Sequence, residues 1–296
     1  MNKDLLSQIQ TLYPTFSKGQ KHIAKFIIEH YDKAAFMTAS KLGSIVSVSE
    51  STVVRFASEL GFEGYPQLQK SLQELIRNKL TSVQRIEVST DRLGGGDILE
   101  KVLISDIEKI KKTISELSRE DFEGAVDAIV GASKIYILGV RSSATLASFL
   151  GLYFNYIFDH VVLVNTMSGS GVFEQILRIN RNDVIIGISF PRYSTGTVKA
   201  MKFASDRGAT VISITDSKMS PISRYASYNL IAKSDMASFV DSLVAPLSLI
   251  NALIVAVGMK CQDQVYSTFA ELENIWDEYE VYEKNDNENS GDENKE

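Results

Sequence analysis

The stretch DVIIGISFPRYSTGT (183–197) decides the fold of the larger part of this chain, because an apolar run rich in β-branched residues leads directly into a loop of hydroxyl side chains. Four other runs share this apolar character: KIYILG (134–139), HVVLVN (160–165), ATVISIT (209–215) and YNLIAK (228–233). Continuous apolar runs are typical of parallel strands that are buried on both faces. Helical stretches are expected between and after them, at 142–157, 170–179, 195–207 and 239–260. The alternation predicts a doubly wound α/β domain with a parallel sheet.

Two of the predicted strands end in clusters of small polar residues. Arg141 to Thr145 (RSSAT) follows the first strand, and Pro191 to Thr197 (PRYSTGT) follows the strand at 183–190. In open α/β sheets ligands bind outside the carboxyl ends of the strands, and the free N–H groups of a helix N-terminus favour phosphate. The pattern therefore predicts a site for a phosphorylated, polar small molecule, to which Arg141 or Arg192 could add charge-assisted contacts. The alternative is that these Ser and Thr residues are ordinary helix caps.

Residues 3–79 have the periodicity of helices only, and TASKLGSIVSVSESTVVRFASELGF (38–62) has the pattern of a helix-turn-helix motif. The first helix is expected from about Thr38 to Ile45, and Ser49 is expected to cap the second. Val53, Phe56 and Leu60 provide a core face for that second helix. Its opposite face would enter the major groove of DNA.

The candidate DNA contacts are polar residues of these two helices. Short hydroxyl groups can approach bases or phosphates closely, and an arginine can bond a guanine or a phosphate. The candidates are Lys41 on the first helix and Ser49, Glu50, Ser51, Thr52 and Arg55 on the second. Lys18 and Lys21 could add backbone contacts, which would make binding depend on salt. The alternative is a small helical bundle whose polar residues are merely solvated.

Composition shifts divide the chain into segments. We expect a DNA-binding domain at 1–79, a linker at 80–96 that ends in three glycines, and an α/β domain at 97–282 that begins with two helices. Residues 283–296 (EKNDNENSGDENKE) are acidic and low in complexity, so we expect a disordered tail. The formal net charge of −6 comes largely from the C-terminal end and says little about the partners of the N-terminal helices.

Several classes of function are disfavoured by composition. One cysteine and three widely spaced histidines argue against a disulfide or a metal site, and no P-loop or dinucleotide-binding motif occurs, so we expect neither metal nor cofactor. The start of the chain has no apolar signal core. Two uncharged stretches, 142–158 and 242–259, have the minimum length of a membrane span, but they contain polar residues and lack basic flanks. We expect them to be buried in a core or an oligomer interface, with no membrane association and a cytoplasmic location.

The order of these parts resembles the RpiR family of bacterial transcriptional regulators, on the strength of VSESTVVRFASELGFEGY, ILGVRSSA and ISFPRYSTGT. The resemblance implies a helix-turn-helix joined to a sugar isomerase (SIS) domain that binds a phosphosugar and alters operator affinity. It also implies that Ser142 and Ser143 in the first loop, and Ser189, Ser194, Thr195 and Thr197 in the second, bind the sugar phosphate. Homodimers or homotetramers are expected to form through helices of the SIS domain, which fits the uncharged stretch 242–259.

Three functions remain open from the residues. The first is a transcription factor controlled by a sugar phosphate. The second is an SIS-type sugar phosphate isomerase, for which Glu174 is the best candidate base, although no histidine is well placed because His160 lies at the opposite end of its strand. The third is a structural or protein-binding role for the helical module.

Overall fold

The structure is a computed structural model that describes residues 5–79, 96–164, 171–234 and 240–282. The predicted linker at 80–96, except Gly96, and the predicted tail at 283–296 lie outside these residues. The chain divides into two compact units. The first unit comprises Met1–Glu116, Phe190–Ser194 and Ala232–Ala245, and the second comprises Leu117–Ser189, Thr195–Ile231 and Pro246–Glu296.

The N-terminal residues form short helices around one apolar core. They are α1 (Leu5–Leu12), the 3₁₀ turn η1 (Tyr13–Thr15), α2 (Lys18–Glu29), α3 (Tyr31–Ala34), α4 (Ala39–Ile45), α5 (Glu50–Glu59) and α6 (Tyr65–Lys79). Ser17 caps α2 in a capping box, in which Ser17 N–H donates to Gln20 Oε1 at 2.8 Å. The caps fix where each helix begins because they satisfy N–H groups that have no partner inside the helix.

The core of these helices contains the residues that the periodicity assigned to it. Val53, Phe56 and Leu60 are buried, and the ring of Phe56 packs edge-on against Phe16 at 5.1 Å between centroids. The predicted core face of the second motif helix is therefore confirmed.

Side chains of α6 satisfy backbone carbonyls between α3 and α4. The Tyr65 hydroxyl donates to Met37 O at 2.8 Å, Gln69 Nε2 donates to the same carbonyl at 2.9 Å, and Gln73 Nε2 donates to Ala35 O at 2.9 Å. Burial raises the pKa of Tyr65 to about 12. These bonds fix the segment that leads into α4.

The second unit contains a sheet of five parallel strands in the order β2-β1-β3-β4-β5. All five predicted strands are present: β1 (Ile135–Gly139), β2 (Val161–Val164), β3 (Val184–Ile188), β4 (Thr210–Thr215) and β5 (Tyr228–Ile231). Every residue of β1 and β3 is buried, as expected for central strands covered on both faces. The doubly wound parallel sheet is confirmed.

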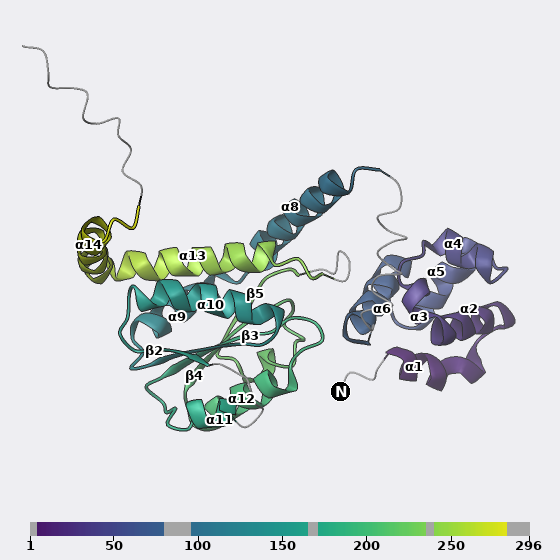
Figure 1. Cartoon of the computed structure of the whole chain (residues 1–296). Coiled ribbons are helices and arrows are strands. Elements are labelled where there is room, and N and C mark those ends of the chain that lie inside the picture. Colours follow the sequence, from purple (N-terminus) through teal and green to yellow (C-terminus); the bar gives the residue numbers. More distant parts are fainter. Residues whose placement is uncertain (1–4, 80–95, 165–170, 235–239, 283–296) are drawn as a thin grey trace, which may run out of the picture. The chain divides into compact units, whose positions relative to one another are not determined.

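Helices cover both faces of this sheet (Figure 1). One face carries α11 (Gly171–Gln175) and α12 (Thr195–Asp206), whose buried residues form a core with Tyr136, Leu138 and Ile185. The other face carries α9 (Arg119–Val130), α10 (Ser142–Asn155) and α13 (Val244–Lys260). The helix α8 (Ile98–Glu116) belongs to the first unit, in which it is joined to 232–245 by two hydrogen bonds, from Lys233 N–H to Thr113 Oγ1 and from Ser242 Oγ to Asp106 Oδ1.

Three helices differ from the sequence-based expectation. The helix expected at 170–179 is shorter, and the one expected from 239 begins at Val244. The helix α14 (Gln262–Glu278) was not predicted; it turns by 99° from α13 and buries none of its residues. Among the described residues no single helix is long and apolar enough to cross a membrane, and only the bent pair of α13 and α14 meets that criterion jointly.

Gly43 allows α4 to approach the turn that follows it. A Cβ atom at this position would lie 2.8 Å from the backbone oxygen of Val48. We expect Gly43→Ala to lower the free energy of unfolding by about 1–3 kcal/mol, because a backbone atom cannot move aside as a flexible side chain could. Chemical denaturation of the full chain measures this loss.

The matched control is Gly64→Ala in the same set of helices, where a Cβ would meet only Pro66 Cδ at 3.7 Å. Equal stability of the two variants would contradict the close approach at Gly43.

Candidate functional sites

The helices α4 and α5 form the predicted helix-turn-helix. The Thr38 side chain caps α4 by accepting from Lys41 N–H, and Ser49 caps α5 by accepting from Thr52 N–H at 3.3 Å. Between them Ser47 adopts a left-handed conformation with φ 57°, in the turn where a glycine is common in this motif. Val48 N–H donates to Gly43 O at 2.8 Å, and Val48 packs against the helical core. Ser47 thus adopts the left-handed conformation that a turn glycine would otherwise provide.

Most of the predicted DNA contacts lie on the exposed side of this motif. Ser49, Glu50, Ser51, Arg55 and Lys41 are all exposed. The Arg55 Nε–H donates to Ser51 O at 3.3 Å, which holds the base of the guanidinium against the helix. Thr52 differs from these residues because it is half-buried. A Cβ on Gly19 would lie 3.5 Å from Thr52 Cγ2, so the methyl group of Thr52 faces α2.

One residue on this face was missed by the sequence analysis. Val54 is 39% exposed and lies between Glu50 and Ser58 on the outer side of α5. The spacing in the sequence indicates this position, because residues 50, 54 and 58 are four apart and share one helix face.

The predicted ligand loops lie at the topological switch point of the sheet. In the strand order β2-β1-β3-β4-β5 the connections diverge between β1 and β3. Open α/β sheets in general bind ligands outside the carboxyl ends of the strands at such a point. Gly139 pairs with Ile188 in the register of these strands. Val140 and Ser189, which directly follow these strands, therefore leave the sheet side by side.

Ser142 and Ser143 are the first two residues of α10, so helix capping does not account for them. The N-cap residue is Arg141, whose side chain makes no capping hydrogen bond and whose φ of 59° is left-handed. Ser142 is exposed and Ser143 is buried. A Cβ on Gly139 would lie 2.3 Å from the Ser143 backbone oxygen. Because Gly139 has no side chain, the first turn of α10 can pack closely against the end of β1.

Ser189 follows β3 directly and is held by β4. Its N–H donates to Ile214 O at 3.1 Å, and its carbonyl accepts from Thr215 Oγ1 at 2.7 Å. Ser189 and Thr215 are both buried. Thr215 was not among the predicted site residues, although it ends a strand at the same edge.

The remaining predicted ligand residues belong to the start of α12. Thr195 is exposed, whereas Thr197 is fully buried and faces the interior. Ser194 immediately precedes α12 and is counted with the first compact unit. After β4 the Ser220 Oγ is buried without a hydrogen-bond partner among the described residues, which the sequence did not indicate.

The residues considered for catalysis lie outside the loops that follow β1 and β3. Glu174 is exposed on the short α11, and His160 precedes β2 at the amino edge of the sheet. Within the described ranges no group of three or more His, Cys, Asp or Glu could hold a metal ion.

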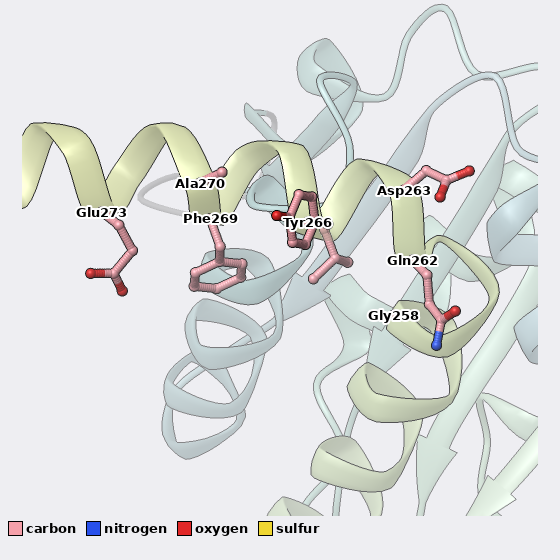
Figure 2. A pocket seen from close by; sticks show the side chains of 8 residues that line it. Gly258, Gln262, Asp263, Tyr266, Phe269, Ala270 and Glu273 are labelled. Atoms are coloured by element: carbon pink, nitrogen blue, oxygen red, sulfur yellow. The ribbon is translucent and has the colours of Figure 1, made fainter.

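An open groove of about 760 Å³ lies where α13 meets α14 (Figure 2). Tyr266 and Phe269 of α14 line it together with Gly258 of α13. None of the predicted site residues contributes to this groove.

Two family models match the chain. Residues 3–79 match the helix-turn-helix domain of the rpiR family, and residues 128–256 match the SIS domain. Among curated relatives, a helix-turn-helix transcriptional regulator of Caldanaerobacter subterraneus is 26% identical over 88% of this chain and 93% of its own length. The transcriptional regulator HexR of Pseudomonas aeruginosa is 23% identical over 87% of this chain and 90% of its own length.

Two solved structures have the same fold. The sugar isomerase domain of an RpiR transcription factor from Sphaerobacter thermophilus is 27% identical, with a TM-score of 0.58, over 60% of this chain and 99% of that one. The NanR protein of Vibrio vulnificus is 21% identical, with a TM-score of 0.57, over 92% of this chain and 98% of that one. With an rpiR-type helix-turn-helix followed by a SIS domain, the chain belongs to the RpiR family of transcriptional regulators.

Proposed function

We propose that this protein is a DNA-binding regulator of sugar metabolism whose α/β domain senses a phosphorylated sugar. The observation that carries the proposal is the placement of Ser142, Ser143 and Ser189 at the β1/β3 switch point of a chain that also presents a helix-turn-helix. Hydroxyl groups and the N-terminus of α10 suit a phosphate, and small side chains leave room for a polar ligand. NanR, which shares the fold, was solved in complex with ManNAc-6P.

We propose that the sugar phosphate contacts six hydroxyl residues of the α/β domain: Ser142, Ser143, Ser189, Ser194, Thr195 and Thr197. We propose that operator DNA contacts six polar residues of α4 and of the start of α5: Lys41, Ser49, Glu50, Ser51, Thr52 and Arg55.

The proposed domain limits are 1–79 and 97–282, with the linker at 80–96 and the tail at 283–296. An operator-binding protein works where the chromosome is, which supports a cytoplasmic location. The position of His160 at the amino edge of the sheet, opposite the carboxyl ends of the strands, supports a sensor rather than an isomerase. We propose that the protein has no cofactor.

We also propose a homodimer or homotetramer, because two helices have apolar side chains that are exposed within the part of the chain that the structure describes. On α13, Val255 is 60% exposed and Met259 67%, in a stretch that carries no charged residue from 242 to 259. On α8, Leu99, Leu103, Ile107 and Ile114 are each more than half exposed and recur at helical spacing. Exposed apolar faces of this extent favour association, and two copies would present two recognition helices to a two-fold operator.

A mobility-shift experiment tests the regulator. The full chain is mixed with genomic fragments, with and without a panel of sugar phosphates. We expect a retarded fragment whose affinity changes with one member of the panel. If no fragment is retarded at any salt concentration, the proposal fails.

Arg55→Ala should weaken operator binding by about 1–3 kcal/mol, because a guanidinium that reads a base edge contributes about this much. Fluorescence anisotropy at fixed salt measures the effect. Lys70→Ala removes the same charge from an exposed position on α6 and serves as the control. The placement of the recognition helix is wrong if both variants bind the operator equally well.

Ser194→Ala should reduce effector affinity about 10-fold or more, because a hydrogen bond to a charged phosphate contributes about 1.5–3 kcal/mol. Calorimetric titration with the sugar phosphate found in the screen measures the loss. Ser133→Ala, at an exposed residue before the amino end of β1, is the matched control. Wild-type affinity in Ser194→Ala would remove this residue from the site.

A further inference from the structure

The outer face of α5 contains one apolar residue among polar ones. Its exposed side chains are Glu50, Ser51, Val54, Arg55, Ser58 and Glu59, and at 3.6 residues per turn they occupy one continuous arc. Val54 lies within that arc, between Glu50 and Ser58, and is 39% exposed. The buried residues Val53, Phe56 and Ala57 occupy the opposite side.

The apolar core of the N-terminal helices does not account for valine at this position. Val54 is not among the residues that form or pack against the apolar core of the N-terminal helices. A β-branched side chain is a weaker helix former than Ala, Lys, Glu or Gln, and an apolar side chain that is 39% exposed gains less from burial than a core residue. A residue that breaks local preferences without a structural gain is a candidate for function.

The chemistry of valine restricts what it can recognise in a major groove. The base edges there present hydrogen-bond donors and acceptors, and the single apolar feature is the C5-methyl group of thymine. Valine can bury that methyl group but cannot pair with the cytosine amino group, which would lose its hydrogen bond to water. A valine in this place therefore favours thymine over cytosine.

We propose that Val54 contacts the C5-methyl group of a thymine in each operator half-site and so determines base preference there. The proposal rests on α5 being the recognition helix of the proposed function. Val54 is the fifth residue of α5, within the N-terminal part that reaches base edges in helix-turn-helix proteins. Its neighbour Arg55 is held at Nε by Ser51 O, and its terminal nitrogens remain donors for an adjacent base or phosphate.

The test removes one methyl group from the DNA at a time. In an operator fragment from the mobility-shift experiment, each thymine is replaced by deoxyuridine, which lacks only the C5-methyl group. We expect the full-length protein to lose affinity about fourfold at one thymine of each half-site, the value of one buried methyl group. In Val54→Ala the same replacement should change affinity by less than 1.5-fold at that thymine, a threshold of about 0.2 kcal/mol.

Two further variants separate this contact from a general weakening. Val54→Ile keeps an apolar group in place and should retain the penalty, as should Ser58→Ala on the same helix face. If Val54→Ala keeps the wild-type penalty, or if wild type shows none at any thymine, the assignment of Val54 is overturned while the regulator stands. If no fragment binds at all, it is the proposed function that fails.

Discussion

Parallel pairing between β1 and β3 is the constraint on which the proposed ligand site depends. Because the two strands run in the same direction and are in register at their last residues, Gly139 and Ile188, the chain must leave both of them at one edge of the sheet. Both strands are buried along their whole length, so a shift in register would expose apolar residues or leave backbone groups unpaired. Strand pairing alone therefore places Ser142 and Ser189 in neighbouring segments at this edge of the sheet, independently of contacts between their side chains.

In the N-terminal helices, capping and close packing determine which residues of α5 are exposed. Caps at Thr38 and Ser49 set where α4 and α5 begin, and the close approach at Gly43 sets the turn between them. Phe56 and Val53 then fix the rotation of α5 about its axis, because they are fully buried. This rotation decides which residues of α5 are exposed, and it follows from core packing and not from DNA binding.

The sequence predicted those elements whose patterns are local and missed those that depend on packing between elements. All five strands and the capped helices α4 and α5 follow from periodicity and from Ser or Thr at helix starts. The helix α14 was missed because its apolar residues are diluted among acidic ones, and it buries nothing. The inward position of Thr197 and the bond from Thr215 to Ser189 depend on neighbouring elements, which no local pattern contains.

Strained backbone conformations occur at few positions in the described part of this chain. Among the described residues other than glycine, positive φ occurs at Ser47, Arg141, Arg192 and Glu280. The first lies in the helix-turn-helix turn, and the next two lie in the loops after β1 and β3. Such conformations cost about 1–3 kcal/mol each and persist only where the surroundings impose them. A glycine would relieve that strain at Arg141 and Arg192, but it would remove a guanidinium from each loop, and a guanidinium is the group that would bind the phosphate of the proposed ligand.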